Sequence, residues 1–130
     1  MRDFPSHRQN ILDDLIKIRD KIKPDIVFTP SSDDIHQDHK TIFEESIRAF
    51  KQVSLLGYEE PWNNIVFKTN MLVELQNKHI EKKCEALECY KTQKQRHYLN
   101  KEATMALAKT RGTQIQKGYA EAFEVIRWVI

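Results

Sequence analysis

The chain has 130 residues, of which 40% are hydrophobic and 31% are charged, values that are ordinary for one water-soluble globular domain. Its 21 basic and 19 acidic residues are interleaved and give a net charge of +2, so electrostatics offers no case for a nucleic-acid partner. No apolar run approaches the roughly 20 residues of a membrane span, and the first residues lack the apolar core of a signal peptide. Cys84 and Cys89 fit neither a disulfide framework nor a paired-cysteine metal site, which favours a reducing, cytoplasmic location.

The N-terminal third predicts a helix, a strand and a second helix. Residues 6–9 carry a capping-box pattern, and apolar residues recur at helical spacing over 11–22, ending before Pro24. The apolar run 26–28 predicts a buried strand of a parallel sheet. After a polar loop, apolar residues over 38–53 predict the second helix. Helix, strand, helix is the pattern of an α/β fold, in which ligands lie beyond the carboxyl ends of the strands.

The rest of the chain predicts a mixture of extended segments and helix. Runs 65–67 and 71–73, after a loop at 57–61, predict strands or extended segments. A helical stretch over 78–111 is expected to break near 92–96 and to end at Gly112.

The C-terminal residues 122–130 have apolar side chains on both alternating faces. A last strand covered on each side is therefore expected there.

The loop after the first expected strand carries the only tight cluster of metal-ligating residue types. Two histidines, His36 and His39, lie among three carboxylates, Asp33, Asp34 and Asp38. Histidine and carboxylate suit zinc in a catalytic site, and i, i+3 spacing at a helix start brings both imidazoles to one side. The alternative is that the carboxylates cap the second helix and the histidines are surface residues. A catalytic zinc usually takes three protein ligands, so this loop cannot complete a site by itself.

Five segments in order resemble the motifs of the LmbE/PIG-L family of zinc-dependent N-acetylglucosaminyl deacetylases. They are 23–30 (KPDIVFTP), 34–39 (DIHQDH), 83–93 (KCEALECYKTQ), 111–112 (RG) and 119–123 (YAEAF). The resemblance implies one partial, Rossmann-like domain over 1–130, with three α/β/α layers, a largely parallel sheet and missing N-terminal strands. It also implies hydrolysis of an N-acetyl amide on an N-acetylglucosamine-type sugar conjugate.

The resemblance assigns roles within the loop at residues 31–39, called the histidine loop from here on. His39 would be a zinc ligand, and His36 would stabilise the oxyanion or protonate the leaving amine. Asp38 would orient one of these histidines, and Asp34 would fix the loop or support a ligand.

Gln93 and Arg111 also match family positions and are expected either near substrate or as a helix cap and a helix-end arginine. Tyr58 and Trp62 are expected either to flank a sugar or to belong to a small core under a loop. Iron or cobalt would use the same ligands as zinc.

One family motif has no counterpart in the sequence. The family opens with a strand followed by Ala-His-Pro-Asp-Asp-Glu, which supplies a histidine and an aspartate to the metal and a second aspartate as general base. The expectation is therefore the C-terminal portion of a deacetylase, inactive alone. The alternative is a non-catalytic remnant or subunit that associates with itself or with a separate N-terminal half. Another metal hydrolase, such as an esterase, fits the loop but not the downstream motifs.

Overall fold

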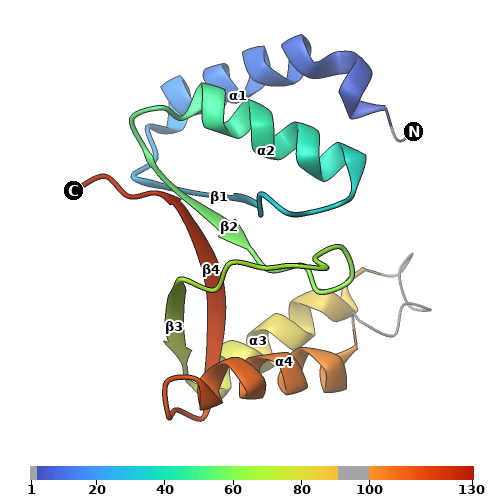
Figure 1. The fold of residues 1–130 in the computed structure, drawn as a ribbon, viewed down its shortest axis with the longest axis vertical. Helices are drawn as coiled ribbons and strands as arrows, with labels where there is room; N and C mark the ends of the chain where they lie inside the picture. The colour runs from blue at the N-terminus through green and yellow to red at the C-terminus, as the bar shows by residue number, and fades with distance from the viewer. Residues whose placement is uncertain (1–2, 91–99) are drawn as a thin grey trace. The chain divides into compact units, whose positions relative to one another are not determined.

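The computed structural model describes residues 3–90 and 100–130 of the chain (Figure 1). In chain order the elements are η1 (Phe4–His7), α1 (Arg8–Ile22), β1 (Ile26–Pro30), α2 (Gln37–Ala49), β2 (Ser54–Tyr58), β3 (Met71–Leu75), α3 (Asn77–Glu88), α4 (Lys101–Thr113) and β4 (Tyr119–Arg127). The chain divides into two compact units, Met1–Asn70 with Phe123–Ile130, and Met71–Ala122. No helix of the two described stretches is both long and apolar enough to cross a membrane.

A four-stranded open sheet in the order β1-β2-β4-β3 confirms a mixed α/β fold. β1 and β2 are parallel, joined through α2, with Ile26 opposite Ser54 and Pro30 opposite Tyr58. β4 runs antiparallel to β2, with an irregularity in register between Leu55 and Leu56. The prediction of a largely parallel sheet is therefore not confirmed. An apolar run buried on both faces looks the same in either direction, so the sequence did not indicate the direction of β4.

In the first unit, α1 and α2 lie side by side along β1 (Figure 1). Their shared core comprises the buried residues Leu12, Ala49 and Phe50, with Leu15, Ile16, Val27 and Val53 packed against it. The helix predicted over 11–22 is confirmed, and it ends as Lys23 turns left-handed before Pro24. The predicted capping box is wrong, because residues 4–7 form a 3-10 turn and no side chain caps α1.

An ion cluster around one buried carboxylate joins the two helices of this unit. The carboxylate of Glu45 is fully buried and accepts from Arg8 Nε at 2.7 Å and from Arg48 Nη1 at 2.6 Å. A carboxylate taken out of water needs such charged donors, because its desolvation otherwise costs on the order of several kcal/mol. The cluster therefore sets how α1 lies on α2, the helix that begins at the histidine loop.

β2 is a strand that the sequence analysis missed, whereas the run 65–67 is not a strand. Ser54 to Gly57 are all buried in β2, but the pattern there continues that of α2, and Gly57 resembled a loop residue. Gly57 is needed for a close approach instead, since a Cβ at this position would lie 2.9 Å from Ser31 Cα. Ile65 and Val66 are exposed in an irregular segment. The strand predicted at 71–73 is confirmed as β3.

The second unit contains α3 and α4, which share a core of Ile80, Cys84 and Ala108. Helix is confirmed over Asn77–Glu88 and Lys101–Thr113, and the expected break at 92–96 lies outside the described residues. The prediction that Gly112 ends the helix is wrong, because Gly112 lies within α4, without a positive φ, and the C-cap is Gln114. Lys83 of α3 forms an ion pair with Glu121 of β4, which links two of the segments that carry the family resemblance. β4 confirms the last predicted strand, although Trp128 to Ile130 lie beyond it and are exposed.

Replacing Gly112 with alanine should destabilise the second unit by about 1–3 kcal/mol, the usual cost of overpacking. Gly112 lies in the last turn of α4, where an added Cβ would lie 2.7 Å from the carbonyl oxygen of Lys117 and 2.8 Å from that of Gly118. Gly118→Ala is the matched control, because nothing lies within 4 Å of its added Cβ. Urea unfolding of both variants measures the difference, and equal stabilities would contradict the close approach.

Candidate functional site

The histidine loop leaves the carboxyl end of β1 and runs into the first turn of α2. Asp34 lies at its centre, with its side chain fully buried and its backbone N–H 3.3 Å from the carbonyl oxygen of Ser31. An isolated antiparallel bridge joins Asp34 to Asn64, and Ile35 N donates to the carbonyl oxygen of Asn63 at 3.1 Å. The loop is thus held from both sides, by its own turn and by the segment after β2.

The carboxylate of Asp34 binds two groups of the loop. Its Oδ1 accepts from the backbone N–H of His36 at 2.8 Å, and its Oδ2 lies 2.8 Å from His39 Nδ1. An ionised carboxylate only accepts hydrogen bonds, so the ring proton of His39 belongs on Nδ1. The Nε2 lone pair of His39 is then available to a metal ion, the arrangement that a carboxylate behind a metal-ligating histidine produces.

His36 has the opposite arrangement. It is the N-cap residue of α2, and its Nδ1 accepts from the backbone N–H of Asp38 at 3.2 Å. In the neutral ring the proton of His36 therefore lies on Nε2, which becomes a donor. The two imidazole rings lie 4.6 Å apart between centroids, at 31° to each other. The pair thus offers one lone pair and one N–H donor side by side.

Asp38 contacts a histidine through its backbone rather than through its carboxylate. Its side chain is buried, and Oδ1 accepts from the backbone N–H of Phe4 in η1 at 3.3 Å. For the two histidines of the loop, the carboxylate that contacts a ring directly is that of Asp34, at His39. Asp38 therefore joins the first turn of α2 to the N-terminal segment.

The remaining candidates are Gln93, Arg111, Tyr58 and Trp62. Arg111 lies in α4 of the second unit, with Nη1 3.1 Å from Gln114 Oε1, and Gln93 falls outside the described residues. Burial, with the negative charges of Glu60 and Asp34, raises the pKa of Tyr58, so its phenol keeps its proton at neutral pH. Trp62 is exposed.

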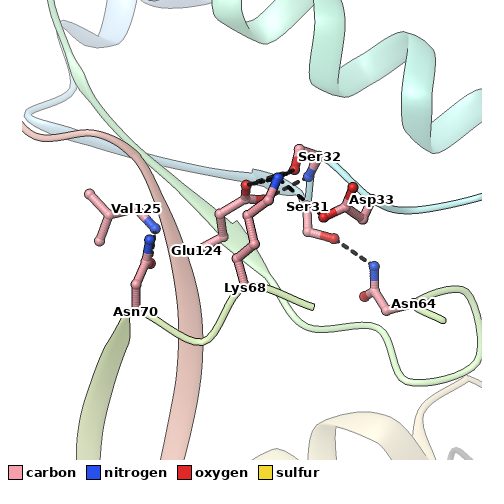
Figure 2. A network of polar contacts seen from close by, with 8 residues as sticks. All are labelled: Ser31, Ser32, Asp33, Asn64, Lys68, Asn70, Glu124 and Val125. Carbon is pink, nitrogen blue, oxygen red and sulfur yellow. Dashed lines mark hydrogen bonds and ion pairs between the residues drawn. The ribbon is translucent and has the colours of Figure 1, made fainter. Parts of the chain in front are cut away.

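A second polar network, which the sequence analysis missed, holds the start of the loop (Figure 2). Glu124 of β4 accepts from Ser32 N at 2.7 Å and from Ser32 Oγ at 2.6 Å. Lys68 donates to Ser32 Oγ at 2.7 Å and pairs with Asp33 at 3.2 Å. Hydrogen bonds to Asp33 and Glu124 raise the pKa of Lys68 and keep it charged. In the sequence, this network could have been suspected only from Glu124, an acidic residue in a predicted strand with apolar side chains on both faces.

No complete metal site is found among the described residues. Among them, no three His, Cys, Asp or Glu side chains are grouped so as to hold a metal ion. His39 Nε2 suits a borderline metal such as zinc, and its support by Asp34 is the support that such a ligand needs. The residues present therefore fit one ligand position and its orientation.

Comparisons with known proteins bear on the fold. No family model matches the sequence. No curated protein matches it either.

Solved structures do match. The conserved protein TT1542 from Thermus thermophilus aligns with a TM-score of 0.75 at 19% identity, over 93% of this chain and 60% of that one. GalB, the 4-carboxy-2-hydroxymuconate hydratase from Pseudomonas putida, aligns with a TM-score of 0.74 at 16% identity, over 94% and 60%. The zinc inhibited form of teicoplanin deacetylase Orf2 aligns with a TM-score of 0.74 at 18% identity, over 93% and 52%. The chain thus spans between half and two thirds of the length of these structures, and at these identities what it shares with them is the fold.

Proposed function

We propose that this chain forms the C-terminal portion of a metal-dependent N-deacetylase that removes the acetyl group of an N-acetylglucosamine-type sugar conjugate. The observation that carries the proposal is the pair of imidazoles at the carboxyl end of β1, whose contacts with the carboxylate of Asp34 and the N–H of Asp38 favour ring protons on opposite nitrogens. The pair lies in a fold shared with teicoplanin deacetylase Orf2, and the ordered motifs from 23–30 to 119–123 support the same family.

The two histidines divide the work of amide hydrolysis. His39 would bind zinc or another divalent metal through Nε2, while Asp34 holds its ring. Such a metal, when bound, polarises the amide carbonyl and favours deprotonation of water near pH 7. His36 Nε2–H would donate a hydrogen bond to the charge that develops on the carbonyl oxygen. To protonate the leaving amine instead, the ring would first have to take up a second proton at Nδ1 and act as an imidazolium, because the neutral imidazole is not an acid near pH 7.

The remaining metal ligands and the general base would come from outside the described residues. The longer chains of the matched structures support this, because a protein of this fold has room for a further segment. We propose that the segment belongs either to the same protein or to a partner, which includes a second copy of this chain. The substrate class is an N-acetylated amino sugar, and we propose a cytoplasmic location for the reaction.

The natural protein, purified from its own cells through a tag, should release acetate from one or more N-acetylglucosamine derivatives. Chelator should abolish the release, and added zinc or cobalt should restore it, because the carbonyl and the water both need the metal. The 130-residue chain alone should bind zinc weakly and release no acetate. Absence of chelator-sensitive release from every sugar of the panel would contradict the deacetylase proposal.

A non-catalytic subunit is the second candidate. It is favoured by the absence, within 3–90 and 100–130, of a group of side chains that could hold a metal. Replacing His39 in the natural assembly distinguishes the two candidates. Acetate release should be unchanged if this chain is a non-catalytic subunit, and it should fall if His39 belongs to the catalytic site.

A further inference from the structure

Glu124 is a buried carboxylate that the proposed chemistry does not use. It lies in β4, is 6% exposed, and both of its oxygens accept hydrogen bonds from Ser32 across 92 positions of sequence. Its Oε1 also lies 3.3 Å from Lys68 Nζ (Figure 2). Removing a carboxylate from water costs free energy unless hydrogen-bond donors replace the water, so the donors to Glu124 need to stay in place.

The backbone around Glu124 is built to admit these contacts. Gly57 of β2 lies opposite Glu124, and a Cβ there would come within 3.3 Å of Glu124 Oε2 and 2.9 Å of Ser31 Cα. Because Gly57 has no side chain, the backbone of β2 can approach both Ser31 of the loop and Glu124 of β4. Asn70 Oδ1 accepts from Val125 N at 2.6 Å, which ties the segment carrying Lys68 to β4 (Figure 2).

Ser32 is connected to the histidines through its chain neighbour Ser31 and a set of hydrogen bonds that begins there. Ser31 Oγ accepts from Asn64 Nδ2 at 2.7 Å, and Asn64 bridges Asp34. Asp34 then holds His39 Nδ1 at 2.8 Å. Asn63 Nδ2 lies 3.3 Å from the same ring nitrogen, but both groups are donors while the ring proton is on Nδ1, so this contact is no hydrogen bond in that tautomer. Displacing Ser31 and Ser32 would therefore move the carboxylate that sets the tautomer of His39.

We propose that Glu124 is a positioning residue for His39: by anchoring Ser32, it keeps Asp34 in place and the ring proton of His39 on Nδ1. The inference rests on the site geometry of the proposed function but needs neither metal nor substrate. In Glu124→Gln, one oxygen becomes an NH₂ group that cannot accept hydrogen bonds. At the Oε2 position this removes the bond from Ser32 N–H, and at the Oε1 position it removes those from Ser32 Oγ and Lys68. The anchor is then weakened and loses its charge, while the volume of the side chain is kept.

The test is the tautomer of His39 in the ¹⁵N-labelled 130-residue chain, read from couplings between ring nitrogens and ring carbon-bound protons at about pH 8.5, above the ordinary imidazole pKa. The unsubstituted chain should show His39 protonated on Nδ1 and His36 on Nε2. In Glu124→Gln the ratio of Nδ1–H to Nε2–H at His39 should fall about tenfold, the effect of weakening one charged hydrogen bond. Glu121→Gln, on the same strand and paired with Lys83, is the control and should leave the ratio unchanged.

A purely structural role for Glu124 would lower the unfolding midpoint and leave the tautomer of the folded chain as it was, which would overturn the inference. If Glu124→Gln does not fold, Ser32→Ala replaces it under the same criterion, because it removes the hydrogen bonds of Ser32 Oγ to Glu124 and Lys68 and alters no strand. A chain in which His39 is already protonated on Nε2 would instead contradict the site geometry behind the proposed function.

Discussion

His39→Ala is expected to remove the metal from the natural protein and to reduce acetate release to the level seen with chelator. In the proposed site the imidazole would supply one of the roughly three protein ligands that a catalytic zinc takes, and alanine offers no replacement. Asp34→Asn should have a graded effect, with metal affinity lowered about 10- to 100-fold, because the amide holds the ring less strongly than the carboxylate that accepts from Nδ1.

Metal content by mass spectrometry and acetate release measure both effects. His79→Ala is the control: His79 lies in the first turn of α3, where its Nδ1 accepts from Gln76 N. The His79→Ala protein should therefore keep as much metal as the unsubstituted protein. Loss of metal in His79→Ala together with retention in His39→Ala would mean that His39 is not the ligand.

His36→Ala is expected to keep the metal and to lower kcat by about 10²- to 10³-fold, the usual loss when one donor to a developing oxyanion is removed. The Nδ1 of His36 also caps α2, so alanine should cost about 1 kcal/mol of stability as well. Activity is therefore compared at a temperature at which both proteins are folded.

His36→Gln separates the two possible tasks of this side chain. Glutamine keeps an N–H donor but carries no titratable proton. Recovery of most of kcat would assign His36 to the oxyanion, and no recovery would assign it to the leaving amine. A His36→Ala protein that loses metal while His39→Ala keeps it would reverse the two roles.

The histidine loop illustrates how far local pattern can lead. The strand at β1, the polar loop and the start of α2 followed from an apolar run, a polar run and helical spacing. The prediction that this apolar run is buried was wrong, because Ile26 and Phe28 are exposed in this structure. The i, i+3 placement of His36 and His39 brought their rings to 4.6 Å between centroids, as expected from a helix start. Which carboxylate holds which ring did not follow. From the sequence, Asp34 and Asp38 were equally good candidates to contact a histidine ring. In the structure, the turn at Ser31 directs Asp34 toward His39, whereas the carboxylate of Asp38 accepts from the backbone N–H of Phe4 in η1.

The sequence by itself determined the α/β class, the helices α1, α2, α3 and α4, and the loop that carries the candidate site, because each depends on residues close together in the chain. Tertiary structure alone decided the strand β2, the direction of β4 and the contacts of Glu124. Each of these depends on partners far apart in sequence, such as Glu124 with Ser32 across 92 positions, and on space left by Gly57. A hydrogen bond between distant segments has no periodic signature, so no pattern of spacing predicts it.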